Sequence, residues 1–344
     1  MAYSTIDKSS LFQNNVLYTG TSGTTDVTGV GFEPSLIWAK DRGRAENPCC
    51  YDAVRGGGKR LLTSATNAEN DEGSNGISAF NSDGFTCGQD GSSGQDGENY
   101  VAWNWKAGTT SGLSGGTITP TAYSINTTSG IGIYHYNCTG ANATIAHGLS
   151  SAPKMLITKS LGDTSPWAVW HTGLTDATKY LVLNTTAAEA TGAAMWNSTA
   201  PSSSVISLGT DGQTNGTGKN NIMYAFSEVT GYSAFGRYKG NGNAAGPYIY
   251  TGFKPSFIMV KRYDSGSINW VIADNKREGY NPDNDPLYPD VNVAEGTADN
   301  INICSTGFKI INSGDDYNND GGYYIYAAFG QPIVGSNGVV ATGR

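Results

Sequence analysis

The stretch GVGFEPSLIWAKDR at residues 29–42 decides the fold of this chain, because the chain repeats it twice. Its counterparts are AHGLSSAPKMLITKS at residues 146–160 and YTGFKPSFIMVKR at residues 250–262. The alignment superposes Pro34, Pro153 and Pro255, and likewise Lys40, Lys159 and Lys261. The copies lie about 119 and about 102 residues apart, which is the size of a domain. The repeat therefore predicts three tandem units built on one plan.

Three further elements recur in the same order behind this block. A polar stretch with an Ala-Glu pair comes first, at residues 63–70, 183–191 and 289–297. A short strand that ends in a turn follows, at residues 77–88, 195–209 and 301–311. An aromatic strand closes each copy, as NYVAWNWKAG (99–108), NIMYAFSEV (221–229) and GYYIYAAFG (322–330). Four matched elements in one order are not a chance match.

The repeated strand is apolar on both faces in its first copy. In LIWAK, at residues 36–40, Leu36 and Trp38 point to one face while Ile37 and Ala39 point to the other. This pattern indicates a strand at the centre of a sandwich.

Composition favours an all-β chain. Glycine is 47 of 344 residues, about twice its average share, and Lys and Arg total only 21. Glycine and asparagine supply the positive φ angles of tight turns, so this balance is typical of short strands joined by many turns. Turn signals about every 8 to 12 residues are typical of β-sandwiches and jelly rolls. Because no Cys/Trp/Cys pattern occurs, we expect jelly-roll or lectin-like sandwiches rather than immunoglobulin domains.

The repeat divides the chain into five segments. Units 1, 2 and 3 are expected at residues 1–108, 131–231 and 232–334, each a β-sandwich. Residues 109–130 are rich in Gly, Ser and Thr and predict a linker or extended arm, which would leave unit 1 hinged. Units 2 and 3 follow each other without a linker, so we expect them to pack together. Residues 335–344 predict a small polar tail.

Charge and cysteine content exclude several classes of protein. The formal net charge is −8 and no Lys/Arg cluster stands out, so we expect no nucleic-acid partner. No run of 18 apolar residues occurs, and MAYSTIDKSSLF at the N-terminus lacks the regions of a signal peptide. We therefore expect that the protein is made in a cytoplasm and does not insert into a membrane. The five cysteines are odd in number and lack C-x-x-C spacing, which predicts free thiols.

Catalytic patterns are weak in this sequence. The three histidines, His135, His147 and His171, all lie in unit 2 without a nucleophile that recurs beside them, so each is interpreted as structural. The G-x-S-x-G match at residues 112–116 lies in the expected linker, without the strand and helix that a nucleophile elbow requires. We therefore expect a protein that is not an enzyme.

One loop of unit 3 suggests a calcium site. Asp316, Asn318 and Asp320 alternate before Gly321, as in the first half of a calcium-binding loop, where alternate oxygens surround a hard cation. The closing Glu is missing, because that position is Ala327. A complete EF-hand is therefore excluded, and two interpretations are left: a calcium site, or a solvated hairpin loop.

Tyrosines in the loops of unit 3 are the candidates for glycan binding. Tyr280, Tyr288 and Tyr317 are expected between strands, and tyrosine rings can stack on sugars while their hydroxyls form hydrogen bonds. Asp283 and Asp285 are nearby and would join the same surface. For the aromatic residues of the strands, packing between sheets is the simpler interpretation.

Longer strings extend the comparison beyond the repeat: MAYSTIDKSS (1–10), YDAVRGGGKRLLTS (51–64), FNSDGFTCG (80–88), VTGYSAFGRYKGNG (229–242), NWVIADNKR (269–277) and YYIYAAFGQP (323–332). With these strings the chain resembles, over essentially its whole length, a family of virion proteins from marine bacteriophages that are called tail fibre or structural proteins. The resemblance implies a lectin-like or jelly-roll module in a virion, assembled in the host cytoplasm. It carries over no catalytic residue.

Three functions are consistent with these observations. The first is a non-enzymatic virion protein of the tail fibre or adsorption class, which binds host envelope glycans, contacts other virion proteins and forms a homo-oligomer, preferably a trimer. The second is a capsid decoration or head-fibre protein, in which three units in one chain imitate a trimer on the capsid lattice. The third is a polysaccharide-degrading spike, which needs two carboxylates about 5 to 9 Å apart. Because the strands repeat and the loops differ, we expect specific recognition where the copies disagree, above all in the loops of unit 3.

Overall fold

The three repeated blocks form the central strands of three antiparallel sheets. These strands are β3 (Leu36–Asp41), β13 (Pro153–Ser160) and β21 (Phe253–Arg262), and each pairs with a neighbour on both sides. The computed structural model describes residues 4–277, 280–282 and 285–334. Its elements are strands and two short 3₁₀ turns, η1 (Ser9–Leu11) and η2 (Gly73–Asn75), which confirms the all-β prediction. Within these residues, no helix has the length and apolar character that crossing a membrane would take.

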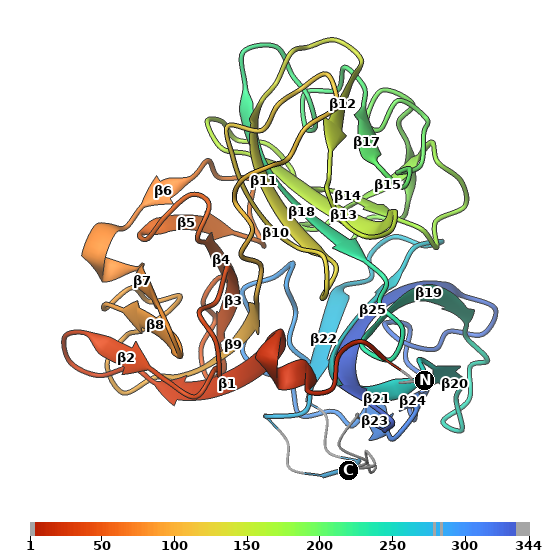
Figure 1. The fold of residues 1–344 in the computed structure, drawn as a ribbon. Helices are drawn as coiled ribbons and strands as arrows, with labels where there is room; N and C mark the ends of the chain where they lie inside the picture. The colour runs from red at the N-terminus through yellow and green to blue at the C-terminus, as the bar shows by residue number, and fades with distance from the viewer. Residues whose placement is uncertain (1–3, 278–279, 283–284, 335–344) are drawn as a thin grey trace.

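Unit 1 combines a large sheet with a small one (Figure 1). The large sheet has six strands in the order β1-β9-β3-β4-β5-β6, and the small sheet has the order β2-β8-β7. The bounds of the remaining strands are β1 (Gln13–Thr19), β2 (Thr25–Val27), β4 (Cys49–Asp52), β5 (Lys59–Leu62), β6 (Asn70–Asp71), β7 (Ile77–Asn81), β8 (Gly84–Cys87) and β9 (Asn99–Trp105).

Unit 2 follows the same plan with one strand added at the edge. Its large sheet has the order β10-β11-β18-β13-β14-β15-β16, and its small sheet pairs β12 with β17. The bounds are β10 (Ala122–Asn126), β11 (Ile131–Asn137), β12 (Ala143–Ala146), β14 (Ala168–His171), β15 (Lys179–Val182), β16 (Ala190–Thr191), β17 (Val205–Leu208) and β18 (Asn220–Ser227).

Unit 3 has the shortest large sheet. Its four strands have the order β19-β25-β21-β22, and its small sheet has the order β20-β24-β23. The bounds are β19 (Ser233–Lys239), β20 (Tyr248–Tyr250), β22 (Trp270–Asp274), β23 (Ile301–Cys304), β24 (Gly307–Ile310) and β25 (Tyr323–Pro332).

Strand register makes individual positions of the three units equivalent. The central strand pairs with the closing strand through Leu36 and Trp105 in unit 1, through Met155 and Phe226 in unit 2, and through Phe257 and Phe329 in unit 3. Counting from these pairs places Trp103 of unit 1 at the position of Tyr224 and of Ala327 in the other two units. Residues matched by this register are equivalent.

Residues 109–130 do not run as a free linker. Ala122–Asn126 is strand β10, which pairs with β11 at the edge of the large sheet of unit 2. Thr109 and Gly116 also form isolated bridges, to Ile125 and Ile145. Glycine and threonine are poor evidence for a linker here, because a sheet edge accepts an added strand wherever its backbone groups are unpaired. The expected tail, residues 335–344, lies outside the described residues.

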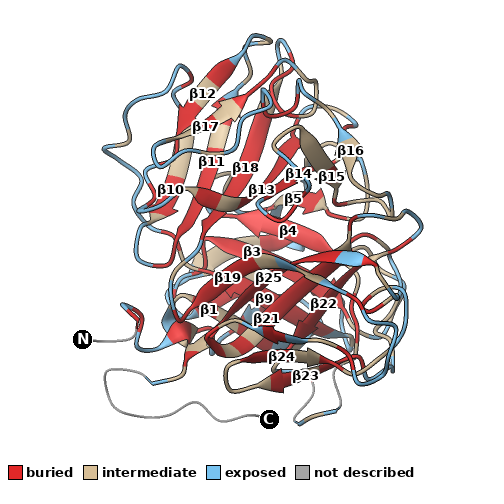
Figure 2. Cartoon of the chain, turned by 90° about the vertical axis from the view of Figure 1, so that its right-hand side faces the viewer, coloured by how far each residue is buried: buried red, intermediate tan, exposed pale blue. Residues whose placement is uncertain are grey.

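The large sheets bury both of their faces, for two different reasons. One face of each packs on the small sheet of its own unit, which gives each unit a separate core. The opposite faces of all three large sheets meet at the centre of the molecule and form one shared core (Figures 1 and 2). The two apolar faces of LIWAK therefore indicate more than a place inside one sandwich. Ile37 packs within unit 1, and Trp38 packs against the other units.

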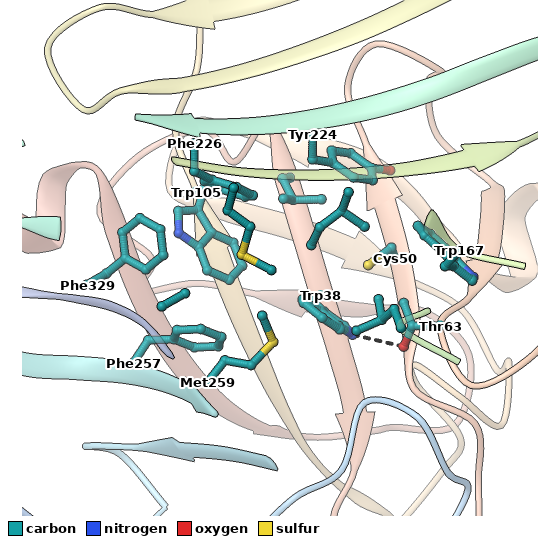
Figure 3. Close-up of a pocket in the computed structure, with 15 residues that line it drawn as sticks. Trp38, Cys50, Thr63, Trp105, Trp167, Tyr224, Phe226, Phe257, Met259 and Phe329 are labelled. Atoms are coloured by element: carbon teal, nitrogen blue, oxygen red, sulfur yellow. Dashed lines mark hydrogen bonds between the residues drawn. The ribbon is translucent and has the colours of Figure 1, made fainter. Parts of the chain in front are cut away.

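A small cavity of about 20 Å³ lies in this shared core (Figure 3). Its lining comes from all three units and is apolar apart from Thr63 and the hydroxyl of Tyr224. The Thr63 hydroxyl accepts a hydrogen bond from Trp38 Nε1 and donates one to Pro289 O. A space of this size holds about one water molecule at most, and an apolar lining gives it too few partners. The cavity is a packing defect rather than a ligand site.

Hydrogen bonds join the units in a closed ring. In one set, the backbone N–H of the glutamate in the Ala-Glu stretch donates to the carbonyl of the residue that directly follows the central strand of the next unit. The three bonds are Glu69 to Leu161 (2.9 Å), Glu189 to Tyr263 (2.7 Å) and Glu295 to Arg42 (2.8 Å). A second set involves the last residue of β4, β14 and β22: Asp52 with Tyr224 (2.7 Å), His171 with the Tyr326 carbonyl (3.1 Å) and Asp274 with Trp103 (3.0 Å). Each unit thus contacts both others, and the expectation that unit 1 is hinged is wrong, because its large sheet completes the shared core.

The repeated lysines support the strands from inside. Lys40, Lys159 and Lys261 are all fully buried. Lys40 Nζ donates to the carbonyls of Asp41 (2.7 Å) and Arg44 (3.3 Å), and Lys159 makes the equivalent pair of bonds. Lys261 instead reaches a carbonyl of unit 2, that of Thr186, at 3.2 Å. Burial lowers the pKa of each lysine to about 8. Their recurrence therefore reflects a common structural role.

His171 occupies the boundary between units 2 and 3 in its neutral form. The backbone N–H of Gly173 donates to its Nδ1 at 2.9 Å, so the ring proton lies on Nε2 and is donated to the Tyr326 carbonyl. Burial lowers the pKa of His171 to about 3. In the unfolded chain a histidine titrates near 6.5, so between these values the unfolded state binds a proton that the folded state does not.

Acid should therefore weaken the protein through His171. At pH 5 the residue is expected to remove about 2 kcal/mol of the stability present above pH 6.5. The variant His171→Gln should be less stable at pH 7 but should lose less on acidification. Urea unfolding of both proteins at pH 7, 6 and 5 gives the change in the free energy of unfolding with pH for each of them. An equal dependence of unfolding free energy on pH in the two proteins would contradict a neutral, buried histidine at this boundary.

Candidate functional site

A cleft of about 510 Å³ opens between units 2 and 3, at the outer end of the large sheet of unit 3. Unit 3 supplies β19, the start of β25 and the residues that follow β21, and unit 2 supplies two residues from loops. The lining residues are Thr175, Glu189, Arg237, Tyr238, Lys239, Tyr263, Asp264 and Tyr323. A volume of this order is typical of small-molecule sites in proteins.

The alternation of strand β19 places charged side chains in this cleft. Phe235 points into the shared core, and Arg237 and Lys239 follow on the same face of the strand because alternate residues share a face. Both are exposed. They pair in register with Ile325 and Tyr323 of β25. The face that is apolar at the centre of the molecule thus becomes polar where the units separate.

Two tyrosines form one wall of the cleft. The ring centres of Tyr263 and Tyr323 are 6.2 Å apart, and their planes form an angle of 41°. Tyr323 is 43% exposed. Lys239 Nζ lies 5.5 Å from the centre of the Tyr323 ring, within the range of a cation–π contact. Burial raises the pKa of the Tyr263 hydroxyl, and the guanidinium of Arg237 beside it partly offsets this effect.

Unit 2 supplies the opposite wall. Glu189 is fixed at two points: its backbone N–H donates to the Tyr263 carbonyl, and its carboxylate accepts hydrogen bonds from the backbone N–H of Thr175 (3.1 Å) and from the Thr175 hydroxyl. The Glu189 carboxylate is therefore held in place before any ligand arrives. Asp264, at the rim, pairs with Arg262 at 2.9 Å.

Arg237 differs from the other arginines that the structure describes. Of the seven arginines within the described residues, six form ion pairs and Arg237 forms none. At the equivalent boundary between units 1 and 3, the cation beside the Ala-Glu stretch is Arg42, and it pairs with Glu295 at 2.6 Å. A smaller hollow of about 250 Å³ lies there, lined partly by Leu17 and Asn99. The boundary between units 2 and 3 thus combines tyrosines with two cations, Arg237 and Lys239, that form no ion pair within the described residues.

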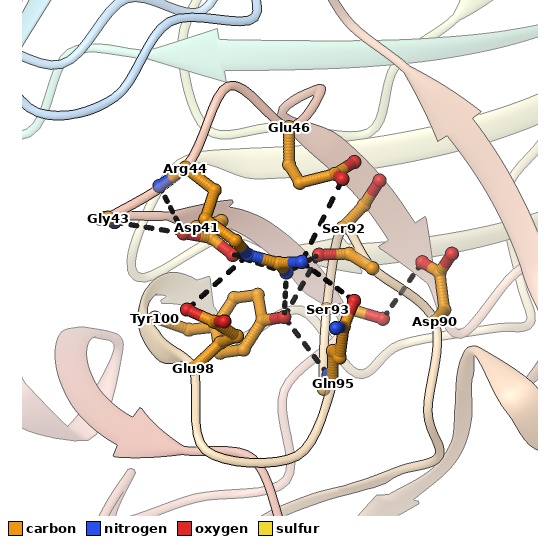
Figure 4. A network of polar contacts seen from close by, with 12 residues as sticks. Asp41, Gly43, Arg44, Glu46, Asp90, Ser92, Ser93, Gln95, Glu98 and Tyr100 are labelled. Carbon is orange, nitrogen blue, oxygen red and sulfur yellow. Dashed lines mark hydrogen bonds and ion pairs between the residues drawn. The ribbon is translucent and has the colours of Figure 1, made fainter.

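A second polar cluster, in unit 1, is satisfied internally (Figure 4). Arg44 lies at its centre and contacts the carboxylates of Asp41 (2.6 Å), Glu98 (3.4 Å) and Glu46 (4.0 Å). The same guanidinium donates to the Tyr100 hydroxyl at 3.1 Å. Because its donors are directed at protein groups, we interpret this cluster as a support for the loop after β3 and not as a binding site.

The structure does not gather the glycan-binding residues that the sequence suggested. Tyr280 is exposed and Tyr288 is half-buried against the core of unit 3. Tyr317 lies inside that core at 3% exposure, so the expectation that its ring contacts a sugar is wrong. The Asp285 carbonyl accepts a hydrogen bond from Arg277 at 2.7 Å, and Asp283 lies outside the described residues. None of the four described residues lines the cleft.

The suggested calcium loop has a structural counterpart in unit 2. Asn318 is fully buried, its Oδ1 accepts from Asn241 N (2.8 Å), and its Nδ2 donates to the carbonyls of Asn243 and Asn312. Asn215, at the equivalent turn of unit 2, forms the same kinds of side-chain hydrogen bond with backbone groups of the neighbouring loops. Asn318 is therefore not free to bind a metal ion. Asp316 is partly buried, with its pKa raised by burial, and Asp320 is exposed.

Sequence reasoning missed Arg237, Glu189, Tyr263 and Tyr323. A signal was present in the opening strands, where unit 3 has Arg-Tyr-Lys and the aligned positions of unit 1 have Leu-Tyr-Thr. Charged residues at strand positions that are neutral in another copy mark a local change of environment. The partner residue Glu189 lies in another unit, and no spacing along the chain connects it with this strand.

Comparison with known proteins places the whole ring in one family. No match to the chain was found among curated proteins or among solved structures. The family described as "Domain of unknown function (DUF7483)" matches residues 8–332, a span that contains all strands from β1 to β25. The chain therefore belongs to the family described as Domain of unknown function (DUF7483).

Proposed function

We propose that the protein is a non-enzymatic bacteriophage virion protein of the tail fibre or adsorption class, and that the cleft between units 2 and 3 binds a host-surface glycan. The observation that carries the proposal is the wall of Tyr263 and Tyr323 opposite the fixed carboxylate of Glu189. Aromatic rings stack on the apolar faces of sugars, and a carboxylate accepts hydrogen bonds from their hydroxyls. Both groups face one cleft of suitable size.

The closed ring of units supports this proposal. The cleft lies on a boundary that the backbone bond from Glu189 to Tyr263 and the shared core hold rigid. A rigid site loses little conformational entropy when it binds, which favours recognition of flexible ligands such as glycans. Assembly into a homotrimer would present three such clefts, and their combined avidity would strengthen a weak single site.

The variant Tyr323→Ala tests the site directly. It removes the more exposed ring of the wall, and we expect its affinity for host envelope polysaccharide to fall about fivefold, because an aromatic stacking contact contributes on the order of 1 kcal/mol. Titration calorimetry with purified polysaccharide fragments measures the change.

The internal repeat supplies a matched control. Asn99 is the equivalent residue of unit 1, so Asn99→Ala alters the same strand position away from the cleft and should leave the affinity unchanged. Equal losses in both variants would show that the effect is structural. If the unmodified protein bound neither host cells nor envelope polysaccharide, the proposed receptor role would be abandoned.

Capsid decoration is the second candidate, and the closed ring favours it. Three equivalent units around one centre give a single chain a threefold-like surface. Such a surface matches the symmetry of positions on a capsid lattice. Immunogold labelling of virions distinguishes the two candidates: label on the tail supports adsorption, and label over the head supports decoration.

A polysaccharide-degrading spike is the third candidate. The carboxylates that line the cleft are Glu189 and Asp264. Asp264 is paired with Arg262, and Glu189 accepts hydrogen bonds from Thr175. Neither carboxylate is placed as a free general acid, so we expect that incubation with host capsule releases no reducing ends. Release of reducing ends would contradict a non-enzymatic function.

A further inference from the structure

We propose that the glycan bound between units 2 and 3 is anionic, carrying carboxylate or phosphate groups that Arg237 recognises. This inference rests on the proposed function, because it names the chemical class of ligand for the same cleft. Arg237 and Lys239 lie two residues apart on one face of β19, so their Cα atoms are about 7 Å apart. That spacing suits two successive charged groups, or one charged group and the neighbouring ring.

The positive charge is specific to this copy of the repeat. The equivalent residues are Leu17 and Thr19 in unit 1 and His135 and Asn137 in unit 2. The strands are otherwise built alike, so the fold does not require cations at these positions. Two cations that replace neutral residues at the rim of a cleft indicate a ligand requirement.

The carboxylate that unit 2 places in the cleft forms no ion pair with these cations. At the two other boundaries, the carboxylate of the Ala-Glu stretch binds an arginine: Glu69 binds Arg55 at 3.0 Å, and Glu295 binds Arg277 at 2.6 Å. The third carboxylate, Glu189, instead accepts hydrogen bonds from Thr175. Within the described residues, neither Arg237 nor Lys239 forms an ion pair.

The chemistry of the cations selects the ligand. A guanidinium presents paired donors that match the two oxygens of a carboxylate or phosphate, which gives orientation as well as attraction. Lys239 lies over the Tyr323 ring, so a sugar stacked on that ring has an ammonium group beside it. The chain as a whole carries a net charge of −8, so its overall field repels anions. Preference for an anionic glycan would therefore be a local property of this cleft.

Three hexasaccharides test the proposal with the full chain: oligo-alginate, which carries carboxylates, a phosphorylated maltohexaose, and neutral maltohexaose. We expect at least one anionic ligand to bind about tenfold or more tightly than neutral maltohexaose at 150 mM salt. Arg237→Gln should remove that preference, so that the variant binds the anionic and the neutral hexasaccharides with similar affinities. Arg237→Lys should recover only part of it, because an ammonium lacks the paired donors.

Lys309→Gln is the charge-matched control, since Lys309 lies on β24 in the small sheet of unit 3. An equal loss of preference in Lys309→Gln would show a general effect of net charge and would overturn the proposal. Equal binding of anionic and neutral ligands by the unmodified protein would overturn it too, and would leave glycan binding itself intact. Failure to bind any glycan, host polysaccharide included, would instead overturn the proposed function.

Discussion

Replacing Trp105 by alanine is expected to lower the free energy of unfolding by about 3–5 kcal/mol and to destabilise all three units together. Trp105 is 2% exposed, in the shared core. Its ring packs edge-on against Phe226 of unit 2 (6.2 Å) and against Phe257 (5.2 Å) and Phe329 (5.7 Å) of unit 3. Phe226 and Phe329 are its equivalents and lie 5.7 Å from each other. One aromatic residue from each unit thus contacts the other two.

Calorimetry and urea unfolding followed by fluorescence measure this effect. A shared core makes the three units one cooperative body, so unmodified protein and variant should each show a single transition. Trp105→Phe is the matched control, because phenylalanine occupies the equivalent position in both other units, and it should cost clearly less than the alanine variant. Separate transitions, with only one shifted by the substitution, would contradict a shared core.

The repeat predicted the elements that local sequence determines. Alternating apolar residues and glycine-rich turns identified the strands, because strand periodicity and turn geometry are properties of a few consecutive residues. The aligned lysines identified equivalent positions, and the structure buries all three. The all-β fold followed from these local signals.

The arrangement of the units could not be predicted in this way. The hydrogen bond from Trp103 to Asp274 joins residues 171 positions apart, and the sequence around either residue does not indicate its partner. The second apolar face of the central strands was the available clue, and it was assigned to a single sandwich because two-layer packing is the usual reason for it. Three sheets that share a centre produce the same pattern.

The residues of the candidate site were not predicted from the sequence. Recognition was expected in the loops of unit 3, whereas Arg237, Lys239 and Tyr323 lie on strands β19 and β25. The loop tyrosines were less informative, since Tyr317 turns inward to fill the core of unit 3. Glu189 belongs to the repeated stretch, so the sequence does not distinguish it from Glu69 and Glu295. The structure does, because the carboxylate of Glu189 binds Thr175, whereas the other two bind arginines.

Replacing Arg55 by leucine is expected to cost about 3–5 kcal/mol, because it leaves a buried carboxylate without its cation. Asp52 is fully buried, and its carboxylate accepts hydrogen bonds from Arg55 Nε (2.6 Å) and from the Tyr224 hydroxyl of unit 2 (2.7 Å). Glu69 would lose the same partner. Unit 3 repeats this arrangement with Asp274 and Arg277 at 2.6 Å.

Unit 2 shows how the site is built without an ion pair, and this gives the test its second arm. At the equivalent positions it has His171 and Leu174, both buried. The double variant Asp52→His/Arg55→Leu should therefore be more stable than Arg55→Leu alone, since it removes the stranded carboxylate along with the guanidinium. Urea unfolding of the two single variants and the double variant gives the coupling energy between the positions. A double variant that loses the sum of the two single losses would show that the pair is not coupled, and that the fold tolerates the charge of Asp52 by other means.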